Sequence, residues 1–221
     1  MLACKIYTLI LFNLLGFPRK DVIIDSLTMA VSSDINAAKA TLETKTAELQ
    51  GLINANIALD AATKAAEVEV AYGRSFYAGA ANASTPHAGE VIGILAGKTP
   101  GAVKSGMEAA LAALERTGFE EVNTVPYLAH TVASVGSFLA KEAGVPVGSA
   151  IAYLIAPPLE SMYALDFALK AADVRLCRLY APPSETNFGG ALLSGTQSAC
   201  AAACEAFANA VADTARKPVE N

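Results

Sequence analysis

The sequence predicts an α/β fold made of two similar domains in tandem, with helices packed on antiparallel-rich sheets. Three observations support this fold: an internal repeat, the order of apolar segments in the two halves, and a composition rich in small apolar residues. The chain has 221 residues, of which 53% are hydrophobic and 17% are charged. That length suits one large domain or two domains of about 100 residues each, and the repeat favours two.

The repeated segment is an Ala-rich helix that runs into a strand. Residues 164–176 (ALDFALKAADVRL) match residues 58–70 (ALDAATKAAEVEV) without a gap, at an offset of 164 − 58 = 106 residues. This offset is far too long for a solenoid repeat and suits a duplicated small domain. Chance agreement between Ala-rich helices is the alternative, but the ordered matches at Leu, Asp, Lys and Val argue against it. We therefore place the domains at residues 1–115 and 116–221.

The beginning of the chain, residues 1–50, is the least regular part of the first domain. The apolar run 1–17 is interpreted as a buried strand or helix, with a targeting or surface-anchoring segment as the alternative. It carries no small-x-small cleavage site and is short for a membrane span. Residues 22–24 are β-like, Ser32–Asp34 supply helix caps for a helix over 35–49, and Leu52–Ile53 is expected to be a strand fragment.

Both halves then read strand, helix, strand, loop, strand, helix, which is typical of helices on one side of a mostly antiparallel sheet. In the first half, Thr99 is a plausible cap for a helix that begins at Pro100 and ends near Gly118. The segment 127–141 between the halves is predicted to be helical from its periodicity. The remaining predictions are strands at 68–72, 90–97, 150–156, 174–180 and 190–194, and a helix at 197–215.

Composition excludes several functional classes. The net charge is −5 and no Lys/Arg-rich run is present to neutralise phosphates, so nucleic acid is not an expected partner. A membrane is not an expected partner either. The four cysteines lack paired CxxC spacing and indicate free thiols in a reducing cytosol. Abundant apolar residues and few charges suggest that much of the surface is buried in an assembly.

Three sequence motifs resemble catalytic or metal-binding sites, but none of them has all the features that such a site requires. Gly97-Lys98-Thr99 lacks the earlier glycine of a P-loop, because Ile92 stands there. Ser184 has no base tied to it by a motif. Cys200 and Cys204 are four residues apart on a predicted helix. In one interpretation they bind a metal together with His87 or His130; in the other they are small packing residues. We favour packing, and we expect His130 to be a structural histidine on a helix face. We predict no enzyme, no cofactor and no metal.

Several longer stretches together resemble a known family. They are YLIAPPLE at 153–160, ALD at 164–166, AADV at 171–174, PPSETNF at 182–188, YGRS at 72–75, YAGA at 77–80 and GEV at 89–91. These stretches are similar to the EutL family of bacterial microcompartment shell proteins of ethanolamine utilisation, and the similarity runs from about residue 58 to Pro218. It implies two circularly permuted BMC-type domains per chain and a homotrimer that forms a pseudohexameric tile. It also implies tiles packed edge to edge with other shell proteins in the cytosolic microcompartment shell.

The resemblance also implies a pore and a small-ligand site. The segment 73–89 is the expected gate, with a long surface loop as the alternative; its residues are Gly73, Arg74, Ser75, Tyr77, Gly79, Asn82 and Gly89. Ethanolamine contacts carried over from the family fall on Glu90, Phe119, Thr186, Asn187 and Phe188. A carboxylate beside amide, hydroxyl and aromatic groups suits a small ammonium alcohol. The acidic pair that the family carries before the first repeated helix is absent between Leu52 and Ala58.

Two classes of function follow from these observations. The first is a structural shell protein with a gated pore for metabolites. The second is a stand-alone trimeric α/β protein that binds a small ligand or acts as an enzyme, for which the sequence offers no catalytic constellation.

Overall fold

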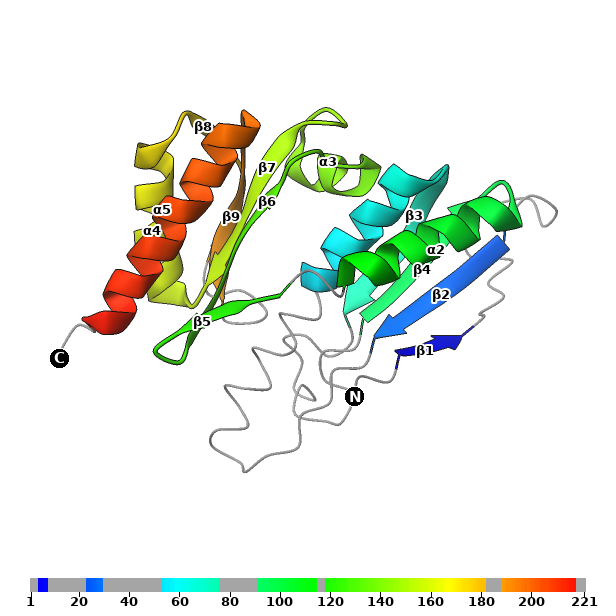
Figure 1. Ribbon diagram of the computed structural model, residues 1–221, viewed down its shortest axis with the longest axis horizontal. Coiled ribbons are helices and arrows are strands. Elements are labelled where there is room, and N and C mark those ends of the chain that lie inside the picture. The colour runs from blue at the N-terminus through cyan, green and yellow to red at the C-terminus, as the bar shows by residue number, and fades with distance from the viewer. Residues whose placement is uncertain are drawn as a thin grey trace, which may run out of the picture. The chain divides into compact units, whose positions relative to one another are not determined.

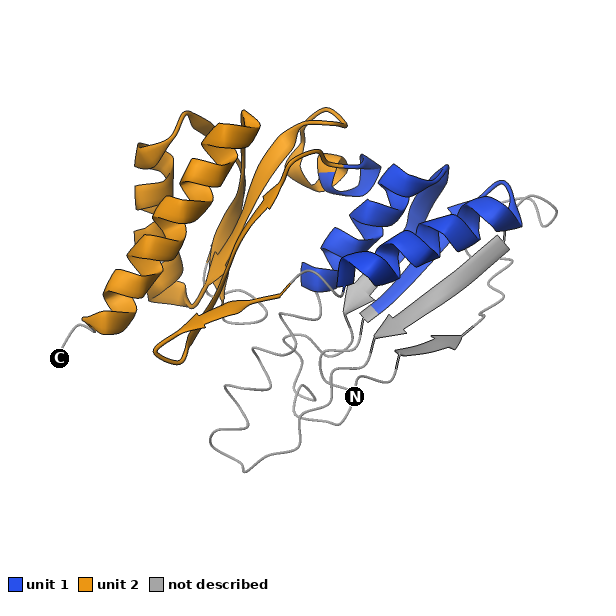
Figure 2. Ribbon diagram, viewed as in Figure 1, with its two compact units in different colours: residues 1–117, 136–139 blue, residues 118–135, 140–221 orange. Residues whose placement is uncertain are grey.

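The computed structural model describes residues 4–7, 23–29, 53–75, 91–114, 118–181 and 188–217 (Figure 1). The chain divides into two compact units (Figure 2). Unit 1 comprises Met1–Thr117 together with Gly136–Leu139, and unit 2 comprises Gly118–Val135 together with Ala140–Asn221. A short segment after residue 135 therefore belongs to unit 1, although the chain on both sides of it belongs to unit 2.

Unit 2 is an antiparallel sheet with two helices on one face (Figure 1). The strand order is β5-β6-β7-β9-β8. The strands are β5 (Glu120–Val122), β6 (Val125–Val132), β7 (Ala150–Ala156), β8 (Val174–Tyr180) and β9 (Gly189–Gly195), and the helices are α4 (Pro158–Ala171) and α5 (Gln197–Arg216).

The core of unit 2 lies between this sheet and the two helices. Every residue of the central strand β7 is buried, so the strand reads as a continuous apolar run rather than an alternating one. Small side chains such as Ala164, Ala168 and Ala203 let the helices approach the sheet and each other, while Phe207 fills the space between them. Thr196 caps α5 by accepting the N–H of Ala199 at 3.1 Å.

Unit 1 has the same plan. Its sheet has the order β1-β2-β4-β3, and its helices cover one face. The strands are β1 (Cys4–Tyr7), β2 (Ile23–Met29), β3 (Val68–Ser75) and β4 (Val91–Gly97), and the helices are residues 53–65 and α2 (Pro100–Leu114). The predicted Thr99 cap is confirmed, because its Oγ1 accepts the N–H of Ala102 at 3.2 Å.

The predicted duplication is confirmed at the level of strand register. The order β1-β2-β4-β3 of unit 1 matches β6-β7-β9-β8 of unit 2. In each unit a β-bulge interrupts the pairing of the edge strand, between Val70 and Tyr72 in β3 and between Leu176 and Arg178 in β8. These positions differ by the same 106 residues as the repeat. The two halves therefore share an irregularity of the backbone as well as a sequence pattern.

The largest error of the sequence analysis lies between the halves. Residues 127–141 were expected to form one helix, but the structure has strand β6 and then the short helix α3 (Ser137–Ala143). In β6 the side chains of Leu128 and Val132 are buried together with their β7 partners Ile155 and Ile151, and the Tyr127 side chain is buried as well. A strand that is apolar on both faces loses its alternation and can imitate helical spacing. For the same reason His130 lies on a strand rather than on a helix.

Smaller boundary errors occur in the first half. The expected strand fragment at Leu52–Ile53 is wrong at Ile53, where a helix over residues 53–65 begins to be described, and Leu52 lies outside the described residues. Two residues are too few to define a period. The expected loop from residue 73 is wrong at its start, because β3 continues to Ser75. Helix α2 is described from Pro100 to Leu114, and residues 115–117, which precede the expected end near Gly118, lie outside the described residues. The expected helix at 35–49 lies outside the described residues. Within the apolar run 1–17, the described residues are those of strand β1.

No helix within the described ranges is both long and apolar enough to cross a membrane.

Candidate functional site

Of the five expected ligand contacts, the structure describes the two aromatic residues. Phe119 is half-buried and directly precedes β5, and Phe188 is buried and directly precedes β9. Both lie in unit 2. Glu90, Thr186 and Asn187 lie outside the described residues. Each described contact thus sits at the start of a strand, where the sheet fixes the backbone.

The hairpin that follows Phe119 is firmly attached to the rest of unit 2. Asn123 and Thr124 form the turn of this hairpin and have positive φ values of 47° and 66°. A two-residue turn with positive φ at both positions matches the twist of the antiparallel strands that it joins. The amide Nδ2 of Asn123 donates to the carbonyl of Ala215 at 3.3 Å, near the end of α5. The Tyr127 hydroxyl donates to Glu120 Oε2 at 2.7 Å. Burial and this hydrogen bond raise the pKa of Tyr127 to about 12, because both favour the protonated hydroxyl.

Two carboxylates next to Phe119 were not singled out from the sequence. Glu120 and Glu121 follow it directly, and both are exposed. Glu120 is engaged by Tyr127. The sequence signal that could have identified them is a pair of acidic residues directly after an aromatic residue. A strand of three residues is too short for its periodicity to show which side chain lies on which face.

The approach to Phe188 is fixed by contacts at the end of β8. The Tyr180 ring stacks on Tyr153 of β7, with centroids 6.3 Å apart, and the guanidinium of Arg178 lies 5.4 Å from the centre of the Tyr180 ring. Arg178 also pairs with Glu142 of α3. Burial raises the pKa of Tyr180 far above its ordinary value. Ala181 therefore follows one anchored strand, and Phe188 leads into another that begins at Gly189.

The expected gate residues are only partly described. Gly73, Arg74 and Ser75 are paired with Gly93, Ile92 and Val91 of β4, so they belong to the sheet. Tyr77, Gly79, Asn82 and Gly89 lie outside the described residues. The gate itself therefore remains a prediction.

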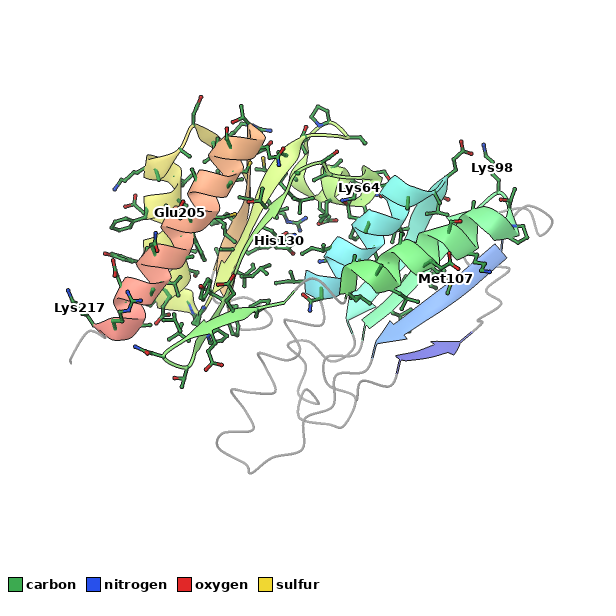
Figure 3. The ribbon with its side chains drawn as sticks, viewed as in Figure 1. Lys64, Lys98, Met107, His130, Glu205 and Lys217 are labelled. Atoms are coloured by element: carbon green, nitrogen blue, oxygen red, sulfur yellow. The ribbon has the colours of Figure 1, made fainter. Side chains whose placement is uncertain are left out.

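The cysteines of α5 pack in the core of unit 2. Thr131 Oγ1 donates to Cys204 Sγ at 3.3 Å, and burial raises the pKa of Cys204 to about 11 and also raises that of Cys200. Such thiols stay protonated at neutral pH and are poor metal ligands. His130 lies on β6 next to Thr131 (Figure 3), and adjacent strand residues point to opposite faces. Among the described residues, no group of three His, Cys, Asp or Glu side chains could hold a metal ion.

The chain is similar to known proteins along most of its length. Residues 46–127 match the BMC domain. The bacterial microcompartment shell protein EutL of Clostridium perfringens (strain 13 / Type A) is 60% identical over 166 residues, which cover 73% of this chain and 76% of the relative. EutL of Escherichia coli (strain K12) is 45% identical over 216 residues, which cover 92% of this chain and 99% of the relative.

Solved structures agree with the sequence comparison. The crystal structure of ethanolamine utilization protein EutL from Leptotrichia buccalis C-1013-b has a TM-score of 0.77 and 48% identity, and the match covers 99% of this chain and 95% of that one. A trimeric shell protein, PduB, has a TM-score of 0.65 at 17% identity, which shows the shared fold alone. The identity to the curated relatives and their coverage show that this chain belongs to the EutL family of bacterial microcompartment shell proteins.

Proposed function

We propose that the protein acts as a trimeric, pseudohexameric tile of the shell around ethanolamine-degrading enzymes, and that a gated pore in the tile passes small metabolites. The observation that carries this proposal is the match to a shell protein over 92% of this chain and 99% of the relative. Members of this family are structural components of the microcompartment shell rather than enzymes. Two similar units per chain suit the proposal, because three chains then supply six similar domains.

Electron microscopy of the purified, overexpressed protein tests the tile. We expect flat sheets or tiles, because heterologous contacts between copies close into rings and rings with apolar rims pack side by side. Dispersed particles that turn over a small substrate would support the stand-alone binding protein or enzyme instead, and would overturn the proposal.

We further propose that the tile binds ethanolamine or a similar small metabolite through Glu90, Phe119, Thr186, Asn187 and Phe188. The support comes from the resemblance, from the described positions of Phe119 and Phe188 at strand starts, and from the chemistry of the group. A carboxylate accepts a charge-assisted hydrogen bond from an ammonium, and an aromatic face attracts the same cation. The gate of the pore is proposed to lie in the segment 73–89. Its residues Gly73, Arg74 and Ser75 belong to the end of β3, and Tyr77, Gly79, Asn82 and Gly89 follow.

Isothermal titration calorimetry with ethanolamine tests this site. We expect Glu90→Gln to weaken binding by about ten- to a hundredfold, since a hydrogen bond to a charged group contributes about 1.5–3 kcal/mol. The matched control is Glu108→Gln on α2, whose carboxylate is exposed and pairs with Lys104 at 3.9 Å; we expect it to bind like the parent protein. Tight binding that Glu90→Gln leaves unchanged would remove the assignment.

A further inference from the structure

Two adjacent glutamates in the hairpin at the edge of the unit 2 sheet lie on opposite faces of that sheet (Figure 1). In the β5–β6 pairing, Glu120 lies opposite Tyr127 and Glu121 lies opposite Pro126. Tyr127 belongs to the core beneath the two helices, so Glu120 lies on the face that the helices cover. Because successive side chains of a strand alternate between faces, Glu121 lies on the face away from α4 and α5.

The two glutamates also differ in their partners. Glu120 accepts the hydroxyl of Tyr127 at 2.7 Å. Glu121 is exposed, and it forms no hydrogen bond or ion pair with the part of the chain that the structure describes. A carboxylate accepts charge-assisted hydrogen bonds from a cation. Of the two carboxylates, that of Glu121 is therefore available to a cationic ligand, and its strand fixes the backbone from which it extends.

The strand register relates Glu121 to both aromatic contacts of the proposed ligand site. Phe119 precedes Glu121 by two residues, so their side chains share a face. Glu121 also begins a row across the sheet, in which Pro126 lies beside it. Continuing the β6–β7 and β7–β9 registers beyond their last pairs adds Pro157 and then Phe188 to this row. Phe119, Glu121 and Phe188 therefore lie on one face, at one end of the unit 2 sheet.

The surroundings of Glu121 on this face favour a small cation. Pro126 and Phe188 are buried and Phe119 is half-buried, so the carboxylate stands beside apolar groups. A charge beside apolar groups is screened less than a fully solvated one. The face of an aromatic ring such as that of Phe119 also attracts a cation. A small amine in its ammonium form suits this combination, whereas the carboxylate repels an anion.

We propose that Glu121 is a specificity-determining residue of the small-ligand site, where its carboxylate accepts a hydrogen bond from the ammonium group of the ligand. The inference rests on the ligand site proposed above, and it adds to that site a residue of the β5–β6 hairpin. Phe119, on the same face, covers the cation with its ring. The acidic pair is absent between Leu52 and Ala58, and Glu121 supplies negative charge for a cationic ligand in addition to Glu90.

Isothermal titration calorimetry of the full chain with ethanolamine tests this role. We expect Glu121→Gln to weaken binding by about tenfold, the lower end of the effect of a hydrogen bond to a charged group. The matched control is Glu120→Gln, which removes the same charge one residue away and on the opposite face. Its amide oxygen still accepts the Tyr127 hydroxyl, so we expect it to bind ethanolamine like the parent.

Reversing the charge gives a second, stronger measurement. We expect Glu121→Lys to show no measurable binding of ethanolamine, because an ammonium then faces an ammonium. The control is Glu205→Lys, which makes the same change in net charge at an exposed position of α5 and should bind like the parent. Glu121→Lys that binds as tightly as Glu205→Lys would contradict the inference. Circular dichroism checks that both variants are folded, which we expect because both glutamates are exposed.

The outcomes separate this inference from the proposals on which it rests. A parent protein that forms tiles but does not bind ethanolamine would overturn the ligand site, and the role of Glu121 with it, while the tile stands. A parent protein that binds ethanolamine, with Glu121→Gln and Glu120→Gln equal to each other in affinity, would overturn only the role of Glu121. Sedimentation velocity of each variant shows whether assembly is unchanged, as we expect for a change at an exposed hairpin.

Discussion

Replacing Gly190 with alanine is expected to destabilise unit 2 by more than about 4 kcal/mol, an effect seen only for strongly disruptive substitutions. Gly190 has a φ of 155° and lies in β9, between Ile155 of β7 and Tyr180 of β8. A Cβ there would lie 1.9 Å from the carbonyl oxygen of Leu154 and 2.9 Å from the Cα of Ile155. Since these are backbone atoms of the central strand, no rotamer change relieves the clash, and β7 and β9 must separate.

Urea unfolding followed by circular dichroism measures this effect. The control is Gly118→Ala, also in unit 2, where a Cβ would meet nothing within 4 Å; we expect its unfolding midpoint to stay near that of the parent. Loss of soluble protein for Gly190→Ala beside soluble Gly118→Ala would agree with the prediction. Equal urea midpoints for Gly190→Ala and the parent would contradict the prediction. They would show that β7 and β9 can move apart to accommodate the Cβ at little cost in stability.

Much of the fold was predictable because its local patterns are strong. The strands β3, β7, β8 and β9 carry β-branched or continuous apolar runs, and the helices α2, α4 and α5 begin at or directly after Thr or Pro. The repeat then placed the same elements in both halves. Strand β6 was mistaken for a helix because its buried faces hide the period of two, and the turn at Asn123–Thr124 that defines its hairpin was not recognised from the sequence.

The candidate site was less predictable than the fold. The aromatic residues Phe119 and Phe188 came from the family resemblance, and no local pattern points to either. The role of Asp60 was not predicted, because its partners Gly136 and Leu139 lie 76 and 79 residues away in sequence. The repeat predicts the same surroundings for Asp60 and Asp166. The Asp60 side chain is nevertheless fully buried, whereas the Asp166 side chain is 57% exposed. This difference arises from the contact of Asp60 with Gly136 and Leu139, which neither copy of the repeat, taken alone, encodes.

Asp60→Ala is the second substitution expected to have a large effect, and we expect it to destabilise unit 1 by about 3 kcal/mol or more. The change removes the acceptors of the Gly136 and Leu139 N–H groups and leaves Lys64, now 3.3 Å from Asp60 Oδ2, without this carboxylate. A buried N–H group that loses its acceptor costs about 1–3 kcal/mol. The control is Glu108→Ala on α2, because its exposed pair with Lys104 contributes about 1 kcal/mol at most.

Asp60→Asn separates the loss of charge from the loss of hydrogen bonds. The amide keeps one acceptor oxygen and turns its NH₂ group toward the second N–H, so we expect a cost near that of Asp60→Ala rather than near the parent. Hydrogen exchange of the Gly136 and Leu139 amides locates the change, and both should exchange faster in each Asp60 variant. If their exchange and the urea midpoint stay at parent values in Asp60→Ala, then apolar packing around Phe138 holds this segment without the carboxylate.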